Sequence, residues 1–406
     1  MNVIKLCSGS AGNGISGSVQ YVYVRDKAYI IILNSKRCFV CDHAGNVIVD
    51  KSIDLGFLAS QVRLWKVFEQ SNSLILRIVG NKSGSLEIVD VLIDISTGNV
   101  SYSQVKSISL SWISTWEEIA HSQIIGDVLF SCDWDGDYHI HAVNLITGED
   151  VDLGTFGLSN PIRVSSKVFL RASTSLQLLM IISEMLAGSD FYVVDLISGS
   201  QVKTINGTGG ASPRPNIGAI SVFKDKLYIP LANSGVNDTS NTLDLYDESF
   251  SKIASIDFSG YIDNPNPWGF SLIAKLSDGK FIFIGNIVNN STNNIDNYVV
   301  GKLNPDFTIY DLQVIRSVDR TPYGGHGEGT SNSLGSYDDK SMIPIIDPKK
   351  KIAFFVIEDA DPNGAGFYPT VYKIDFTDED VVEFNAHSFI VSSKIPTSLS
   401  LLLKPY

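Results

Sequence analysis

The residues best suited to chemistry in this sequence are three aspartates and two histidines within one stretch, DWDGDYHIHA. Asp133, Asp135 and Asp137 alternate around a glycine, and His139 and His141 follow with the same spacing. Carboxylate oxygens are the ligands that Ca²⁺ prefers, and imidazoles bind transition metals. Because side chains alternate across a strand, both histidines would share one face of the strand that carries them. The stretch is a candidate metal site.

A hairpin loop is the alternative explanation for the same stretch. An EF-hand calcium loop has glycine at its sixth position and glutamate at its twelfth, whereas this stretch has glycine at its fourth and no glutamate at its twelfth. Asp and Gly also favour hairpin turns, because they tolerate positive φ and Asp side chains bond nearby amides. Histidines on a strand between two sheets are more often buried with hydrogen bonds than with a metal. The choice depends on the elements around the stretch.

A repeat organises these elements. Each copy has an alternating strand, a short polar turn that usually contains Gly, and a strand that opens with Val or Ile. Four clear copies are centred on Gly45, Gly98, Gly148 and Gly199, which are 53, 50 and 51 residues apart. Three eroded copies follow: LDLYDESFSKIASI, YVVGKLNPDFTIYDL and TVYKIDFTDEDVVEF. The last copy predicts that its two strands pair within the final unit.

Each unit also contains two earlier strands, and four strands at a period of about 50 residues indicate a propeller blade. We predict an all-β fold, a single seven-bladed β-propeller of four-stranded antiparallel blades. A sandwich or a two-domain arrangement of the same strands is the alternative. Stacking of blades on both faces would explain strands that are apolar throughout, such as AYIIILN and KIAFFVI. The predicted blades cover residues 18–58, 59–110, 111–158, 159–208, 215–260, 266–316 and 340–390, with a loop insertion at 317–340.

The repeat cores VVDLISGSQVKTI and VLIDISTGNV resemble the repeats of YVTN-type and quinoprotein-like propellers. In those propellers a D-x-x-T/S-G turn joins the last two strands of a blade. The matching residues are Asp94, Thr97 and Gly98 in one copy and Asp195, Ser198 and Gly199 in another. Propellers with this motif include dehydrogenases, lactonases, lyases and binding scaffolds, so the resemblance implies an architecture and no particular activity.

Loop lengths predict which end of the propeller carries function. Connections from strand two to strand three, and from blade to blade, are long and emerge on the same end, which we call the loop end; the opposite end, with short connections, is the turn end. Long loops on a rigid scaffold usually carry binding. Some of the aromatic residues there would only anchor their own loops. The aromatic residues that we predict for binding at the loop end are Trp134, Tyr261, Trp268, Tyr323, Phe367 and Tyr368.

Composition restricts the partners. The net charge of −13 argues against nucleic acid, because phosphate binding needs clustered Lys and Arg. No apolar run reaches membrane-spanning length, and the first residues lack the features of a secretory signal. We expect no nucleic-acid partner, no membrane insertion, and a cytoplasmic or virion location. Cys38 and Cys41, three residues apart on one strand, are expected to face opposite ways and to share no metal.

Two functions remain open. The first is a non-enzymatic scaffold that binds a protein or a glycan through the loop end, without a cofactor; acidic charge and a composition rich in Ile, Asn and Ser suit a cytosolic scaffold or a viral structural or attachment protein. The second is a propeller enzyme of the lactonase, lyase or hydrolase type with a divalent metal at the channel mouth. Asp133, Asp135 and Asp137 are the candidate ligands, for Ca²⁺.

Overall fold

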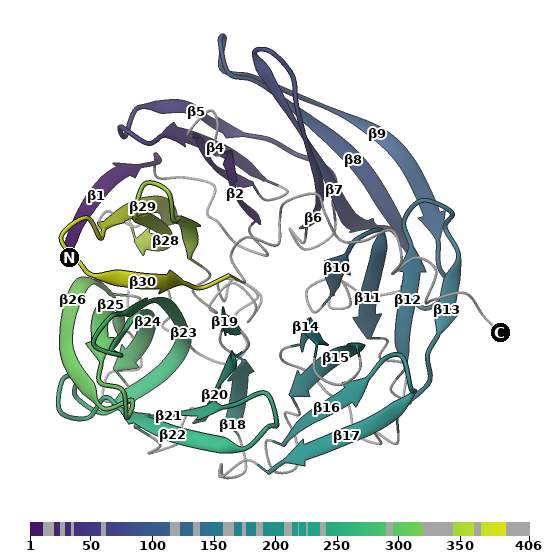
Figure 1. The fold of residues 1–406 in the computed structure, drawn as a ribbon. Coiled ribbons are helices and arrows are strands. Elements are labelled where there is room, and N and C mark those ends of the chain that lie inside the picture. The colour runs from purple at the N-terminus through teal and green to yellow at the C-terminus, as the bar shows by residue number, and fades with distance from the viewer. Residues whose placement is uncertain are drawn as a thin grey trace.

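The computed structural model shows seven antiparallel β-sheets arranged around a central axis (Figure 1). The described residues form thirty strands and no helix, which confirms the predicted all-β, seven-bladed propeller. None of the described segments is a helix long and apolar enough to cross a membrane. The structure describes residues 1–406 except 11–19, 25–28, 34–35, 58–61, 114–121, 133–138, 157–165, 173–175, 184–189, 207–212, 218, 225, 236–240, 290–294, 320–343, 361–366 and 387–406.

The first four blades each pair four consecutive strands, with the first strand next to the axis and the last at the perimeter (Figure 1). Blade 1 contains β2 (Gln20–Val24), β3 (Tyr29–Leu33), β4 (Arg37–Asp42) and β5 (Val47–Ser52). Blade 2 contains β6 (Val62–Glu69), β7 (Ser73–Lys82), β8 (Ser85–Asp94) and β9 (Asn99–Ser109). Blade 3 contains β10 (Gln123–Ile125), β11 (Val128–Cys132), β12 (Ile140–Asn144) and β13 (Asp150–Asp152). Blade 4 contains β14 (Ser166–Ala172), β15 (Leu176–Ser183), β16 (Phe191–Asp195) and β17 (Ser200–Ile205).

The last three blades depart from this plan. Blade 5 contains β18 (Pro213–Ile217), β19 (Ser221–Phe223), β20 (Lys226–Gly235), β21 (Thr242–Tyr246) and β22 (Lys252–Asp257). Blade 6 contains β23 (Pro265–Leu276), β24 (Phe281–Asn289), β25 (Ile295–Leu303), β26 (Ile309–Asp319) and β30 (Val381–Phe384). Blade 7 contains β27 (Ile345–Asp347), β28 (Ile352–Ala360), β29 (Phe367–Asp375) and, as its outer strand, β1 (Asn2–Ser8).

The ring closes through β1, and this overturns the prediction for the last repeat copy. That copy predicted that β29 and the strand after it pair with each other. In the structure β1 occupies the outer edge of β29, in antiparallel register from Asn2 opposite Asp375 to Ser8 opposite Thr370. The displaced strand β30 pairs instead with the end of β23, where Ala274 lies opposite Phe384. A repeat pattern predicts only sequence-local pairs, whereas ring closure joins the two ends of the chain.

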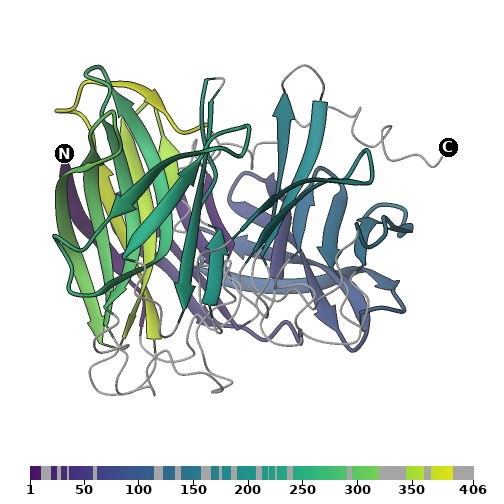
Figure 2. The ribbon, with the colours of Figure 1, turned by 90° about the horizontal axis from the view of Figure 1, so that it is seen from below.

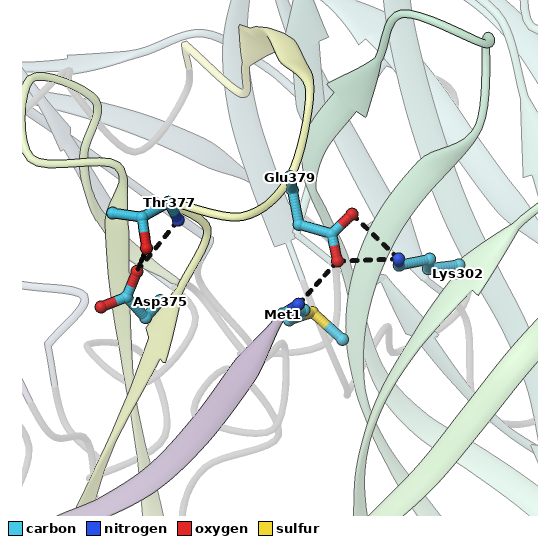
Figure 3. Close-up of polar contacts among 5 residues, drawn as sticks. All are labelled: Met1, Lys302, Asp375, Thr377 and Glu379. Carbon is cyan, nitrogen blue, oxygen red and sulfur yellow. Dashed lines mark hydrogen bonds and ion pairs between the residues drawn. The ribbon is translucent and has the colours of Figure 1, made fainter.

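An ion-pair cluster holds this closure together (Figure 3). The Glu379 carboxylate, between β29 and β30, binds the Met1 amino group at 2.7 Å and Lys302 Nζ at 2.8 Å. Burial opposes the charge on Glu379, but the hydrogen bonds from Lys302 and Met1 prevail and lower its pKa. One carboxylate thus connects β1, β25 and the segment that leads to β30.

Seven hydrophobic clusters make up the core, and each lies between two neighbouring blades. Both faces of a blade are therefore buried, and all residues from Ile30 to Leu33 are at most 2% exposed, as predicted for apolar strands. The Cys38 side chain packs between blades 1 and 2, and the Cys41 side chain packs between blades 7 and 1. The prediction that these two thiols face opposite ways is confirmed.

The turn that follows the third strand carries a polar cap in every blade. An Asp or Asn side chain at the start of the turn accepts hydrogen bonds from amides two to four residues later, as Asp94 Oδ1 does from Ser96 N (2.9 Å) and Thr97 N (3.1 Å). In blade 6 the capping pair is Asn304 and Asp306. The predicted Asp-to-Gly turn is confirmed. The other capping residues are Asp42, Asn144, Asp195, Asp247 and Asp375.

Candidate functional site

Buried polar side chains gather beneath the loop end of the disc, at or beside the strand ends that point there. We call this set the polar belt. It spans blades 1, 2, 3, 6 and 7 in the described part of the chain. Its members are Arg37, Arg63, Asn81, Glu87, Ser122, Ser131, His141, Asn266, Asn286, Asp296, Asn297, Asp359 and Thr370. Burying polar groups costs free energy unless they are hydrogen-bonded, and several members are: Arg63 Nε donates to the Ser122 carbonyl at 2.7 Å, and the Ser8 and Thr370 hydroxyls lie 3.0 Å apart.

In blade 3 the belt includes His141, and His139 of the opening stretch lies beside it. His139 Nδ1 lies 2.8 Å from Asp152 Oδ2, and His141 Nδ1 lies 3.2 Å from Asp150 Oδ1. The His141 ring also stacks on Trp112, with centroids 4.4 Å apart and planes at 18°. The histidines do share one face, as predicted, and each is bound to a carboxylate of the neighbouring strand β13. The structure supports the hydrogen-bonded alternative for them.

Two carboxylates orient the histidine rings. Trp112 Nε1 donates to Asp150 Oδ2 at 2.7 Å, so Asp150 holds both Trp112 and His141. Asp152 is desolvated, but bonds from the Gly154 amide and from His139 lower its pKa. A carboxylate on Nδ1 leaves Nε2 as the nitrogen that can exchange a proton. The His139 side chain is 33% exposed, whereas His141 is 9% exposed, so His139 is the more accessible of the two.

Blades 1, 6 and 7 hold charged pairs in the belt. The buried Arg37 guanidinium donates to Asp50 Oδ1 at 2.6 Å and to the Ser10 carbonyl at 2.8 Å, which fastens the segment after β1 to blade 1. Arg316 on β26 donates to Asp359 on β28 at 2.8 Å and so joins blade 6 to blade 7. The bond to Asp359 raises the pKa of Arg316. Sequence analysis missed both pairs: Arg37 meets Asp50 through the pairing of β4 with β5, and Arg316 meets Asp359 only because blades 6 and 7 stack.

The predicted aromatic residues are placed in different ways. Tyr261 is 45% exposed, and its hydroxyl donates to the Ile309 carbonyl at 3.2 Å, at the turn-end start of β26 and not at the loop end as expected. Tyr368 is half-buried in β29, opposite Asp359. Trp268 lies inside β23 and is 7% exposed, so the expectation that a loop displays it is wrong. Its strand packs against blade 5, where an indole contributes to the core.

Several predicted site residues lie outside the described part. Trp134, Asp133, Asp135 and Asp137 fall within residues 133–138, and Tyr323 falls within residues 320–343. For Phe367 the structure gives only its backbone place at the start of β29. Among the residues that are described, no group of three or more His, Cys, Asp or Glu side chains could hold a metal ion. The roles of these residues stay predictions.

An extra strand lies beside the axis at the turn end. β30 pairs with Ala274, Lys275 and Leu276, the last residues of the inner strand β23. It is the yellow strand that crosses one end of the disc in Figure 2. Asn385 follows it, is 1% exposed, and donates to the Leu272 carbonyl at 2.8 Å while accepting from Val222 N at 2.9 Å. Blades 5 and 6 are thereby linked on the side that faces the axis.

Comparisons with known proteins add structural similarities only. No protein-family model matches the chain, and no curated protein matches it. The structure is similar to the AfRom2 CNH domain at 10% identity, covering 92% of this chain and 99% of that one with a TM-score of 0.45. It is also similar to BBS1N in complex with ARL6DN at 9% identity, covering 93% and 96% with a TM-score of 0.45. At TM-scores below 0.5 these similarities carry no argument about function.

Proposed function

We propose that the chain is a non-enzymatic propeller scaffold that binds a protein or a glycan through its loop end. The observation that supports this most is the polar belt, in which ionisable side chains are bound to one another across strands and blades. Arg37 holds Asp50, and Arg316 holds Asp359. Side chains held in this way stabilise a platform, and a preorganised platform lowers the entropy lost when the loops above it bind a partner.

The proposed contacts are aromatic side chains at this end. We assign Trp134, Tyr323, Phe367 and Tyr368 to this surface, whereas the exposed ring of Tyr261 lies at the turn-end start of β26, where its hydroxyl binds the Ile309 carbonyl. Aromatic faces beside amides and carboxylates suit sugar rings and protein surfaces alike. The acidic charge disfavours nucleic acid as a partner. A cytosolic scaffold and a viral structural or attachment protein both fit this composition.

A propeller enzyme is the second candidate, because of one specific observation. His139 has its Nδ1 bound to Asp152 and a third of its side chain exposed, an arrangement that orients Nε2 as a general base. In this candidate Asp133, Asp135 and Asp137, next to His139 in the sequence, bind Ca²⁺ or another divalent ion. The activity would be that of a lactonase, lyase or hydrolase.

One set of variants tests the two candidates. Binding to a glycan array and cross-linking to cell-lysate proteins would be measured for the wild type, Trp134→Ala, Tyr368→Ala and the control Tyr310→Ala, whose ring is 60% exposed at the turn end. The scaffold function predicts that the first two variants lose partners that the control keeps. Equal binding by all variants would contradict a role for the loop end. Stoichiometric metal in the purified protein, with lactone hydrolysis that needs His139, would favour the enzyme.

A further inference from the structure

Blade 2 extends well beyond blade 3 at the turn end. Its strands have 8, 10, 10 and 11 residues, whereas those of blade 3 have 3, 5, 5 and 3. Figure 1 shows β8 and β9 reaching past the outline of the neighbouring sheets. Two contacts mark where blade 3 stops covering it: Trp65 Nε1 donates to the Gly126 carbonyl at 3.1 Å, and Lys106 Nζ donates to the Ile146 carbonyl at 2.7 Å.

An apolar row crosses blade 2 just beyond these contacts. Phe68, Ile75, Leu92 and Ser101 lie opposite one another on four successive strands. Phe68 is 38% exposed, and Ile75 and Leu92 are half-buried. On the other face of the same sheet Leu74, Leu76 and Ile93 are fully buried against blade 1. One face of the sheet therefore lacks the cover that the opposite face has.

A preformed polar group borders this row. Arg77 binds Asp90 through two bonds of 2.7 and 2.8 Å, and the Arg77 guanidinium lies 5.0 Å from the Phe68 ring centroid. The hydrogen bonds that Arg77 donates to Asp90 raise the pKa of Arg77. Arg77, Asp90 and Ser103 lie opposite one another on successive strands and form a second row. Small serines on β9 leave room above the sheet beside Leu92. We call the two rows the blade 2 platform.

Among the described residues, no strand pairs with the edge beside the platform. Residues Asn99 to Gln104 form the first part of the outer strand β9, are mostly exposed, and include no charged residue. Outer strands usually carry charges, prolines or bulges that discourage pairing with another strand. The bulge and the lysine of β9 come later, at Val105 and Lys106, where the strand meets blade 3. The open part can therefore accept main-chain hydrogen bonds.

The chain itself contains a segment suited to this edge. Residues 387–406, HSFIVSSKIPTSLSLLLKPY, have no acidic residue and two lysines, in a chain of net charge −13. Pro396 and Pro405 disfavour a helix, and Leu399, Leu401 and Leu403 have the spacing of one strand face, with Ser400 and Leu402 on the other face. Burying one such leucine contributes about 2 kcal/mol. A segment of this composition is stabilised when it covers an apolar surface, because its leucines are then removed from water.

The described chain ends close enough for this contact. Ala386 N donates to the Val222 carbonyl at 2.8 Å, so the segment starts beside the axis, just after β30 at the turn end. The eleven residues from 387 to 397, which precede residues 398–403, span at most about 40 Å when extended. A chain of 406 residues has a radius of gyration of about 22 Å when compact, so this length is enough to lead from the axis to the perimeter. The blade 2 platform lies at the same end.

We propose that residues 398–403 add as a strand to the edge of β9 and place Leu399, Leu401 and Leu403 over the blade 2 platform. Pairing with Asn99–Gln104 satisfies main-chain groups that a strand on a sheet face would leave without partners. The leucines lean over Ser101 and Ser103 toward Leu92. Lys404 then lies at the turn end near Asp94 and Glu69, which are acidic. The occupant of the platform is thus a segment of the same chain.

Hydrogen exchange of the full chain tests this proposal. Amides of residues 99–104 should exchange about tenfold or more slowly in the wild type than in Leu401→Asp, because a charge among the leucines opposes docking. Phe68→Glu should give the same loss of protection. Two matched controls should keep the protection of residues 99–104. In Ser400→Asp the changed side chain would face away from the platform, and Tyr310→Glu lies on the outer strand of another blade. Amides of β7 should be unaffected in all variants.

Each other outcome overturns the proposal. Fast exchange at residues 99–104 in the wild type would show that the edge is open. Protection that rises with protein concentration would identify a second copy as the occupant. Protection that appears only after cell lysate is added would identify a foreign protein. Equal protection in the wild type and in Leu401→Asp would show that the leucines make no contact with the platform.

Discussion

The two ends of the disc are held by different kinds of hydrogen bond. At the turn end each blade repeats one local cap, in which Asp94, for example, binds the amides of Ser96 and Thr97. At the loop end the polar belt uses pairs that differ from blade to blade and join distant parts of the chain, such as Arg316 and Asp359. The local sequence of each blade encodes its own cap at the turn end, so this feature occurs seven times. Each hydrogen-bonded pair at the loop end occurs once.

The largest effect is expected from breaking the belt at Arg37. Arg37→Ala leaves the Asp50 carboxylate, which is 18% exposed, without its main partner, and should lower the free energy of unfolding by about 3 kcal/mol. The adjacent Lys36 is the control, because its pair with Asp54 is exposed and Lys36→Ala should cost less than about 0.5 kcal/mol. Denaturant unfolding measures both. Similar losses for the two variants would contradict the proposed difference between belt and surface.

Trp112 tests a smaller part of the belt. Trp112→Phe keeps an aromatic ring against His141 but removes the donor to Asp150, and should cost about 1.5–2 kcal/mol because the lost bond is to a charged, half-buried carboxylate. Unfolding of Trp112→Phe and of Asp150→Asn would be compared. Asp150→Asn keeps an oxygen acceptor and should cost less. An unchanged free energy of unfolding in Trp112→Phe would contradict a stabilising hydrogen bond from the indole to Asp150.

Two glycines test how strongly the turn end depends on local backbone conformation. Gly98 and Gly199 have nearly the same left-handed φ, 68° and 66°, but a Cβ at Gly98 would lie 3.0 Å from the Ile48 carbonyl, whereas one at Gly199 meets nothing within 4 Å. Both changes to Ala should cost about 1 kcal/mol for the backbone conformation, and Gly98→Ala should cost more. Thermal unfolding measures the difference. Equal costs would mean that the backbone of blade 1 at Ile48 moves away from the added Cβ without loss of stability.

The smallest effect is a change in pH dependence at the same turns. The hydrogen bonds from Ser96 and Thr97 lower the pKa of Asp94, so its carboxylate stabilises the folded state above the ordinary pKa of about 3.9. That contribution is lost as pH falls through the lowered pKa of the folded state. Asp94→Asn, which copies the Asn144 cap of blade 3, should weaken the loss of stability between pH 5 and pH 3. An unchanged slope would contradict this.

The fold could be predicted because its signals are local and repeated. Alternating apolar strands and capped turns recur every 50 residues or so, and each copy supports the others. Where the Gly is missing, Phe250 and Phe307 take the left-handed position, with φ of 59° and 65°, and Phe307 stacks on Phe281. Aromatic packing offsets backbone strain there, which a turn pattern built on Gly does not reveal.

The candidate site was predictable only in part. The face shared by His139 and His141 follows from strand period, but their partners Asp152 and Asp150 depend on the register between β12 and β13. Trp268 looked like a loop aromatic because Pro and Asn surround it, yet it lies in the long inner strand β23. A bulge in that strand, between Pro267 and Gly269, accommodates the irregular sequence.

By itself, the sequence determined the blades, their turns and the burial of both faces, because these depend on bonds between residues a few positions apart and on strand period. Only the tertiary structure decided that β1 completes blade 7, that β30 moves to blade 6, and that Arg37 binds the Ser10 carbonyl just after β1. Such contacts form after all seven blades have stacked and brought the two ends of the chain together. No local pattern encodes a partner that only ring closure brings within reach.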